Sequence, residues 1–483
     1  MAQDFGILSV GAYLPRTRLQ RSAIHAANSW FAPGLRGAAK GERAIANWDE
    51  DAITLGVEAA TDCLSALALK PTALVLASTS HPFADRQNAG VVADALGIAG
   101  EGLRAQDMGG SMRAGTSALM NALERGAQVG ASLVVAAEHR RTKVASPQEM
   151  AYGDGAAAVL VGRGSPIATV VATHSESLDF VHSFRMADHS QDYGWEERWV
   201  REEGYLTIVP RAVSALLDKA GVSAQAVTHF CLPCALPKVG AAVAKKLGFR
   251  EASVRDNLSA VCGDTGAAHA LLMLAHALQQ AQAGDLIVVA SFGQGCDALL
   301  VEVTPEVKRL QSTRGVEGAL AHKVASSNYL RFLAFNGLVD MERGMRSETD
   351  KGTPLTSAYR NHAMLQGLMG GRCRHCATVQ FPMGRYCVEP SCKALDSQDP
   401  HSFASSKAKV VSYTADLLTY SPDPPAWYGM VQFKEGGRML IDFSEVESVE
   451  VGDAMRMAFR IKDQDTTRGY VRYFWKAVPD PLG

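Results

Sequence analysis

Four cysteines near the C-terminal end carry the strongest chemical signal in the sequence: Cys373, Cys376, Cys387 and Cys392. Their spacing is typical of two metal knuckles, in which paired thiolates reach a tetrahedral ion from opposite sides. Four thiolates close the coordination shell and leave no position for water, so we expect a structural metal, with zinc (Zn) preferred over iron. The alternative is that the four cysteines are buried and unconnected. We favour it less, because so small a module needs a metal or a cross-link to be stable.

The composition limits the classes of protein that this chain can be. It has 483 residues, of which 47% are hydrophobic and 20% charged, and its formal net charge is -2. This is globular composition for two to four domains of roughly 100 to 200 residues each. The balanced charge argues against nucleic acid as the main partner. No apolar run reaches the roughly 18 residues of a membrane helix, and the N-terminus lacks signal-peptide features, so we expect a cytoplasmic protein without a membrane partner.

An internal duplication indicates how the first 304 residues are organised. ALVLASTSHP resembles THFCLPCALP, and GTSALMNALERGAQVGASLVVAAE resembles DTGAAHALLMLAHALQQAQAGDLIVVAS, with each pair separated by about 150 residues. Both halves alternate buried strands with amphipathic helices. We therefore predict a layered α/β domain with two similar halves over residues 1–304.

The remainder of the chain has a different character. Residues 305–370 are charged, contain one plausible helix near Asn328 to Val339, and are predicted to form a helical connector. Residues 371–400 carry the cysteines and are predicted to form a zinc ribbon. Five short β-patterned runs follow within residues 401–483, which predicts a small barrel of the oligonucleotide/oligosaccharide-binding (OB) type.

The N-terminal body resembles the thiolase superfamily, and within it the hydroxymethylglutaryl-CoA (HMG-CoA) synthase and ketoacyl synthase III branch. The segments that carry the resemblance are GAYLPRTRL, STSHPFADRQNAGVVADALG, AQDMGGSMRAGTSAL, KVGAAVAKKLGF, CGDTGAAHALL and SFGQG. The C-terminal part is similar to the zinc-ribbon plus OB-fold proteins that accompany thiolase-like enzymes. The resemblance implies a duplicated body with α/β/α/β/α layers and an acyl-CoA substrate. It also implies carbon–carbon bond chemistry beside a coenzyme A thioester, and a homodimer whose interface strand lies in LVVAAEH.

The catalytic positions of this family are filled by other residues in the present chain. Met112 stands where the family has its nucleophilic cysteine, and a thioether cannot be acylated. Pro233 falls at the position of the catalytic histidine, although a shift by one residue would place Leu232 or Cys234 there. Asp264 replaces the asparagine that binds the enolate oxygen, and Thr79 replaces the general-base glutamate.

The features that do not depend on a thiol are retained. They are the helix N-terminus at residues 111–114, the glycine turn with Gly293 and Gly295, and the cations Arg113 and Lys238, which could bind a thioester oxygen or coenzyme A. From these features we expect retro-aldol cleavage of a β-hydroxyacyl-CoA without an acyl-enzyme, by a lyase of aldolase type. Two alternatives stay open: an acyltransferase whose nucleophile has moved to Cys234 or Cys262, and a non-catalytic coenzyme A-binding partner subunit.

Such chemistry needs a general base, for which Asp264 is the first candidate because burial can raise the pKa of a carboxyl group into a useful range. Equally, Asp264 could only cap the helix that begins near Thr265. Other candidates lie in the insertion over residues 174–205, where solvated or packed side chains are the more common outcome; they are His182, His189, Tyr193 and Tyr205.

Overall fold

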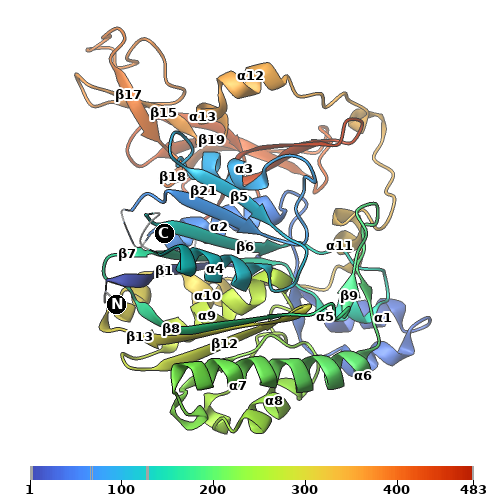
Figure 1. The fold of residues 1–483 in the computed structure, drawn as a ribbon. Helices are drawn as coiled ribbons and strands as arrows, with labels where there is room; N and C mark the ends of the chain where they lie inside the picture. Colours follow the sequence, from blue (N-terminus) through green and yellow to red (C-terminus); the bar gives the residue numbers. More distant parts are fainter. Residues whose placement is uncertain (1–3, 66, 68, 127–129, 481–483) are drawn as a thin grey trace. The chain divides into compact units, whose positions relative to one another are not determined.

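The computed structural model describes residues 4–65, 67, 69–126 and 130–480 (Figure 1). By its internal contacts the chain divides into two units. The first comprises Met1–Ala46, Asp51–Ala89 and Gly100–Leu338, and the second comprises Asn47–Glu50, Gly90–Ala99 and Val339–Gly483. Among the described residues, no helix is both long enough and apolar enough to span a bilayer.

A nine-stranded mixed sheet organises the first unit, and its strand order is β11-β12-β13-β8-β1-β7-β6-β4-β5. The strands are β1 (Phe5–Tyr13), β4 (Ala73–Ala77), β5 (Arg104–Met108), β6 (Ser132–Glu138), β7 (Gly155–Arg163), β8 (Ala168–Ser177), β11 (His229–Cys231), β12 (Leu286–Phe292) and β13 (Gly295–Val303). In one half β4 pairs with β6 in parallel and β6 with β7 antiparallel; in the other half β11 pairs with β12 in parallel and β12 with β13 antiparallel. The same pairing in both halves confirms the predicted thiolase-like duplication.

Two central helices lie between the halves of this sheet, as Figure 1 shows. They are α4 (Ala114–Arg125), which contacts β6 and β13, and α9 (His269–Gln280), which contacts β7 and β12; the two also contact each other. On the outer faces α2 (Ala52–Ser65) packs on β1 and β7, while α7 (Val209–Ala220) packs on β8 and β13. Nearly every residue of α9 is buried because the helix is covered on both sides.

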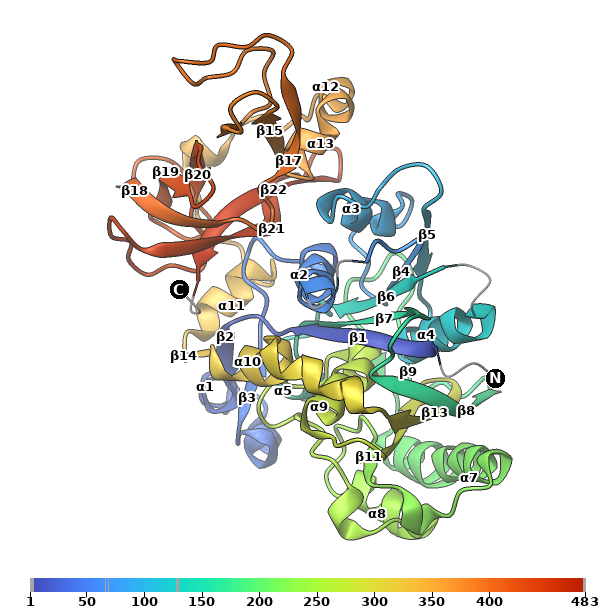
Figure 2. The same cartoon turned by 90° about the vertical axis from the view of Figure 1, so that its left-hand side faces the viewer.

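Shorter elements complete the first unit (Figure 2). They are α1 (Arg21–Asn28), α5 (Pro147–Ala151), α6 (Glu197–Trp199), α8 (Val239–Leu247), α10 (Gly315–Ala321), α11 (Tyr329–Phe335), β2 (Thr17–Gln20), β3 (Glu42–Ala44), β9 (Ser183–Phe184), β10 (Tyr193–Gly194) and β14 (Val324–Ser326). Helix α3 (Asn88–Ala95) begins in the first unit and continues into a segment of the second. The hairpin β9–β10 belongs to the predicted insertion.

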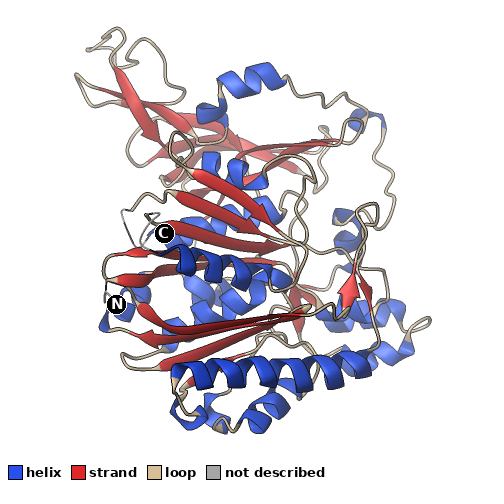
Figure 3. Ribbon diagram, in the orientation of Figure 1, coloured by secondary structure: helices blue, strands red, loops and turns tan. Residues whose placement is uncertain are grey.

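Antiparallel strands form the second unit (Figure 3, red). They make a five-stranded sheet in the order β20-β19-β18-β21-β22 and a three-stranded sheet in the order β16-β15-β17. The five are β18 (Lys407–Asp416), β19 (Ala426–Phe433), β20 (Arg438–Asp442), β21 (Ala454–Asp465) and β22 (Tyr470–Pro479), and the three are β15 (Met369–Cys373), β16 (Val379–Gln380) and β17 (Gln398–Ser402), with helices α12 (Leu355–Arg360) and α13 (His362–Leu365). A bridge between Phe443 and Ala477 nearly closes the larger sheet. This barrel-like sheet and the cysteine cluster are consistent with a zinc ribbon followed by an OB-fold.

Buried charges stabilise this barrel-like sheet. The Asp49 carboxylate, which is fully buried, accepts hydrogen bonds from Lys476 Nζ at 2.8 Å and from Ser444 Oγ at 2.7 Å. Arg460, also fully buried, pairs with Glu50 at 3.3 Å and with Glu445 at 2.5 Å. The segment Asn47–Glu50 therefore supplies counter-charges inside the same unit as strands β21 and β22.

The predicted position of the interface strand is wrong. LVVAAEH lies in β6, whose seven residues are all buried and which is paired on both sides, by β4 and β7. A strand with two partners has no free edge to offer to a second subunit. The strand at that edge of the sheet is β5, where most side chains are partly or fully exposed.

Candidate functional site

The site is built around the turn that precedes α4. Residues 111–113 lead into the helix, and the Ala114 amide donates to the Ser111 carbonyl at 3.0 Å. Beside this turn lies a cavity of about 410 Å³. Its lining comes from the loops after β4 and β5, the start of α4, the insertion and the turn after β12, and consists of Ser78, Thr79, His81, Phe83, Ala84, Asn88, Asp107, Gly109, Gly110, Ser111, Met112, His182, Ser183, Phe184, Arg185, Asp192 and Gln294.

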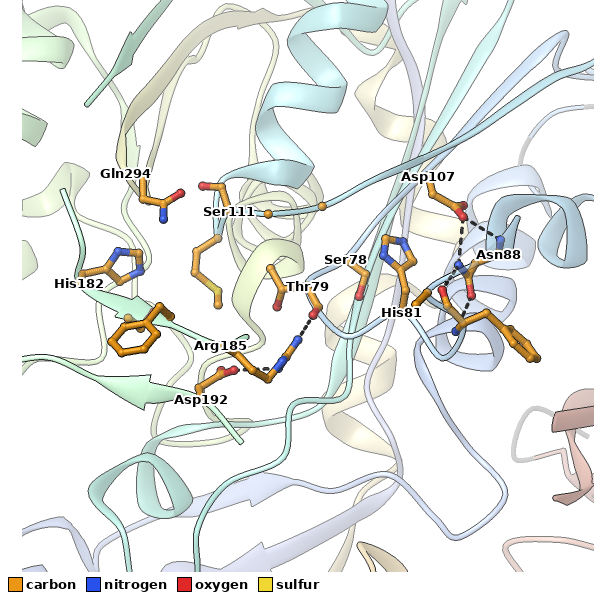
Figure 4. Close-up of a pocket in the computed structure, with 17 residues that line it drawn as sticks. Ser78, Thr79, His81, Asn88, Asp107, Ser111, His182, Arg185, Asp192 and Gln294 are labelled. Atoms are coloured by element: carbon orange, nitrogen blue, oxygen red, sulfur yellow. Dashed lines mark hydrogen bonds and ion pairs between the residues drawn. The ribbon is translucent and has the colours of Figure 1, made fainter. Parts of the chain in front are cut away.

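The fold brings three of the predicted site residues to this cavity: Thr79, Met112 and His182. Figure 4 shows His182 and Gln294 on one side of Ser111, with Thr79 and Arg185 on the other. The His182 ring packs on the Phe292 ring at 5.3 Å between centroids. Burial and then the Arg140 charge lower the pKa of His182, so its imidazole is neutral near pH 7 and able to accept a proton.

Glu138 is the carboxylate that contacts Thr79. It is fully buried at the end of β6, and its Oε1 accepts hydrogen bonds from the Thr79 amide at 2.7 Å and the Thr79 hydroxyl at 3.0 Å. Its Oε2 accepts from the Ser80 hydroxyl at 2.6 Å. Both oxygens are thus engaged in holding the loop after β4, which forms one wall of the cavity.

Arg113 and Gly293 are engaged within the protein. The Arg113 guanidinium donates to Asp297 at 2.6 Å, to Ser175 at 3.1 Å and to the Gly293 carbonyl at 3.0 Å. The Gly293 amide donates to the Gly295 carbonyl at 3.0 Å. A Cβ at Gly293 would lie 3.1 Å from the Met112 and Arg113 amide nitrogens, so glycine is needed for this close approach. These contacts fix the turn before α4. The Gly293 amide already donates its hydrogen bond to the Gly295 carbonyl.

The charged groups around Asp264 give its carboxyl group a different pKa from the one predicted. Its Oδ1 accepts a hydrogen bond from the Gly266 amide at 2.9 Å. This is a capping contact, the alternative role that the sequence predicts for Asp264. Burial favours the neutral acid, but Arg140, at 3.5 Å, and then His269 outweigh it and lower the pKa of Asp264. The predicted rise in pKa is therefore wrong, because the prediction considered the burial of Asp264 and not the charge of Arg140 beside it. Asp264 is not among the residues that line the cavity.

The other predicted residues are not among those that line the cavity. The His189 side chain is 67% exposed and contacts Asp188, while Tyr193 is half exposed and packs on the Phe184 ring. Pro233 follows β11, and Lys238 is exposed at the start of α8 with a left-handed φ of 65°.

The two cysteines that could have replaced the nucleophile are buried thiols. Burial raises the pKa of both Cys234 and Cys262 to about 12. A thiol in that state is protonated near neutral pH and is a poor nucleophile. Tyr205, another predicted candidate, is partly buried and packs on the Phe292 ring at 4.7 Å between centroids; loss of solvation raises its pKa well above the usual value.

The four C-terminal cysteines converge as their spacing predicts. Their sulfur atoms all lie within 4.8 Å of one another, with 3.8 Å between Cys373 and Cys392 and 3.5 Å between Cys376 and Cys387. Tetrahedral zinc with bonds of about 2.3 Å places its sulfur ligands roughly 3.8 Å apart, so the cluster fits this ion. The Ser397 hydroxyl lies 3.3 Å from the Cys373 sulfur, and this hydrogen bond lowers the pKa of Cys373 toward the thiolate that a metal requires.

Known proteins share this body. The duplicated sheet with two central helices, one beginning at a pocket, defines the thiolase class. Residues 217–302 match the family model "3-Oxoacyl-[acyl-carrier-protein (ACP)] synthase III C terminal". The chain is 28% identical over 348 residues to a hydroxymethylglutaryl-CoA synthase of Methanosarcina mazei, covering 69% of this chain and 98% of that protein. It is 30% identical over 321 residues to the Aeropyrum pernix hydroxymethylglutaryl-CoA synthase, covering 63% and 86%.

The chain belongs to the hydroxymethylglutaryl-CoA synthase family of the thiolase superfamily. A structural relative is MvaS in complex with 3-hydroxy-3-methylglutaryl coenzyme A, with a TM-score of 0.58 and 19% identity over 69% of this chain and 92% of that one; at that identity it supports the fold. The predicted retro-aldol cleavage is wrong on these findings, because the relatives are named as synthases, which are condensing enzymes.

Several residues of the site were missed by the sequence analysis, and the charged run Glu138 to Arg141 is the clearest. It begins with the last residue of the buried strand β6 and continues into the loop that follows. Polar residues at the carboxyl ends of parallel strands face the ligand-binding edge of a sheet, and this rule could have found Glu138 and Arg140. Gln294 lies within the SFGQG segment that the sequence singles out, whereas Arg185 and Asp192 carried no signal beyond their place in the insertion.

Proposed function

We propose that this protein binds an acyl-CoA in the cavity beside Met112 and joins the α-carbon of the acyl group to the carbonyl carbon of a second substrate. This is the condensing chemistry of its family, performed without an acyl-enzyme at residue 112. The observation that carries the proposal is the start of α4, where the Met112 thioether and the neutral His182 line one cavity.

Met112 dictates how the acyl group is carried. A thioether has no proton to lose and cannot form a thioester, so the acyl group has to remain on coenzyme A. The burial of Cys234 and Cys262 leaves neither of them a suitable replacement. Addition of an enolate to a carbonyl needs only a base, a polarised thioester oxygen and a proton for the new alkoxide, none of which requires a thiol.

The proposed roles follow from the charges in the site. His182, neutral near pH 7, takes the proton from the α-carbon, and the electron pair of the broken C–H bond moves onto the thioester to give an enolate. The enolate carbon forms the new bond with the carbonyl carbon of the second substrate. The carbonyl oxygen of that substrate becomes an alkoxide and takes up the proton that His182 removed, so that His182 is neutral again and the product is a β-hydroxyacyl-CoA.

Other features complete the proposal. Lys238, exposed at the start of α8, is available for the anionic part of coenzyme A, whereas Arg113 is occupied by Asp297. The cluster Cys373, Cys376, Cys387 and Cys392 would hold zinc as a structural ion of the ribbon. A homodimer and a cytoplasmic location also remain proposals.

Proton exchange at the α-carbon tests the first chemical step. Acetyl-, propionyl- and longer acyl-CoAs are incubated with the protein in deuterated buffer, and deuterium in the recovered thioester is measured by mass spectrometry. We expect exchange above the rate without protein, and its loss in His182→Gln. The matched control is His189→Gln, which changes an exposed histidine of the same insertion and should leave exchange unaltered. Binding of an acyl-CoA without exchange of any member of the series would contradict the proposal.

A further inference from the structure

Arg140 places a buried positive charge directly against Met112. It follows β6 by two residues, and its side chain is 2% exposed. Its Nη1 donates a hydrogen bond to the Met112 sulfur at 3.5 Å, while Nη2 donates to the Asp264 carbonyl at 2.7 Å. The guanidinium therefore lies within hydrogen-bonding distance of residue 112, the position at which the family has its catalytic thiol.

The surrounding fold makes room for this guanidinium and holds it. Gly266 has a left-handed φ of 55°, and a Cβ there would lie 2.9 Å from Arg140 Nε and 3.0 Å from its Cζ. The guanidinium also stacks on Tyr152, 3.6 Å from the ring centroid. Any side chain at position 266 would displace Arg140, so the position of the charge is built into the backbone.

The hydrogen-bonding capacity of Arg140 is only partly used. Three carboxylates act on it. Asp264 pairs with Nη2 at 3.5 Å and also binds the Gly266 amide, whereas Glu138 binds Thr79 and Ser80, and Asp192 binds Arg185. Nε has no acceptor among the described residues. A thioether is a weak acceptor for Nη1, although buried donors normally have a good one.

We infer that Arg140 is a further residue of this site, and that its Nη1 stabilises the negative charge on the oxygen of a thioester seated against Met112. The Gly293 amide, the donor expected from the sequence, is engaged with Gly295. A thioester oxygen that displaces the flexible methionine side chain would accept the hydrogen bond that the sulfur now accepts. A fixed charged donor whose own side chain is buried stabilises such an oxygen strongly. Only the identity of the ligand rests on the proposed function.

A cysteine at position 112 measures the stabilisation of an anion there without any substrate. Met112→Cys is alkylated with iodoacetamide over a range of pH, and the rate is followed by mass spectrometry on the tryptic peptide 105–113, which contains no other cysteine. We expect the pKa of this thiol to lie roughly one to two units below the ordinary value of about 8.5. A value of 8.5 or above would overturn the inference.

A second substitution assigns the effect to Arg140. Combined with Met112→Cys, Arg140→Gln should return the thiol pKa to about 8.5 or higher, whereas Arg140→Lys, which keeps the charge, should retain most of the lowering. Should Arg140→Gln not fold, Gly266→Ala takes its place, because the added Cβ displaces the guanidinium. A thiol pKa that none of the folded variants changes would mean that Arg140 is not the source.

Turnover supplies an independent readout in the wild-type background. Arg140→Lys should lower kcat for α-proton exchange more than it raises KM, because the contact strengthens as charge develops on the oxygen. Equal loss of binding and turnover would contradict this role. If the protein exchanges no acyl-CoA at all, the proposed function fails while the cysteine experiment still decides whether the anion site exists.

Discussion

The buried pair of Asp49 and Lys476 offers a quantitative test of how the second unit is stabilised. Asp49→Asn keeps the shape of the side chain and its contact with Ser444 but removes the charge that neutralises Lys476, whose side chain is 3% exposed. Removing one partner of a buried ion pair typically costs about 3 to 5 kcal/mol, because the remaining charge is left without compensation. We expect a loss at the lower end, about 3 kcal/mol, because the Lys476 ammonium also lies 4.0 Å from the centre of the Trp48 ring.

Amide hydrogen exchange measures this loss locally, which matters because the chain has two units and one unfolding free energy does not describe both. Protection in β21 and β22 should fall by the equivalent of about 3 kcal/mol, a factor of roughly one hundred or more. The matched control is Asp442→Asn in β20, whose partner Lys462 is equally exposed at 38%. That pair should contribute at most about 1 kcal/mol.

Two further results would refute the reasoning. Equal losses in Asp49→Asn and Asp442→Asn would mean that burial of the pair is unimportant. The double variant Asp49→Leu with Lys476→Met should recover most of the loss, since removing both charges leaves no buried charge uncompensated. A double variant as unstable as Asp49→Asn would be the second refuting result.

Burial opposes ionisation of Asp49, but the charges of Lys476 and Arg460 outweigh this effect and lower the pKa of Asp49. Its contribution is therefore complete above the unfolded value of about 3.9 and is lost as the pH falls through the lower folded value, a dependence that Asp49→Asn should lack.

Three other predictions concern the metal and the acid–base groups. Cys373→Ser should lose zinc by elemental analysis and lower protection in β15 to β17; undiminished zinc would exclude the cluster. In the wild type the rate of α-proton exchange should fall on the acidic side of the pH profile at a pH below about 6.5, the ordinary histidine value, because burial and Arg140 lower the pKa of His182. The exchange that remains in His182→Gln should lack this fall, and a fall at a pH above about 6.5 in the wild type would contradict the assignment. Asp264→Asn should reduce exchange by less than about tenfold, against roughly 10²- to 10⁴-fold for His182→Gln, because a carboxyl group with a lowered pKa is a weak base; the reverse order would restore Asp264 as the base.

The elements that follow from local pattern could be predicted from the sequence. Buried apolar runs marked β4, β6 and β12, and the duplication of these runs indicated the two similar halves of the sheet. The five C-terminal strands and the convergence of the cysteines followed from alternation and spacing. In each case the residues that form the feature lie close together in the sequence or repeat at a fixed interval.

The features that were missed depend on residues far apart in the sequence. The pKa of Asp264 is decided by Arg140, 124 positions away. The carboxylate beside Thr79 comes from Glu138 at the end of another strand, 59 positions away. Strand β6 reads as an apolar strand whether it lies in the middle or at the edge of a sheet, so its sequence could not exclude it from an interface. The counter-charge of Lys476 comes from Asp49, 427 positions earlier.

The most direct test of the central claim is one reaction in which the thioester pool and the intact protein are both weighed. The protein is incubated with ¹³C-labelled acetyl-CoA and a β-ketoacyl-CoA, and mass spectrometry follows the coenzyme A esters and the protein together. Condensation without an acyl-enzyme predicts an unchanged protein mass and a labelled β-hydroxyacyl thioester in the pool that carries both coenzyme A groups, because no step of the proposed reaction releases one. A labelled acetyl group on the protein, or a labelled acetyl-CoA that stays unconverted while bound, would contradict the account.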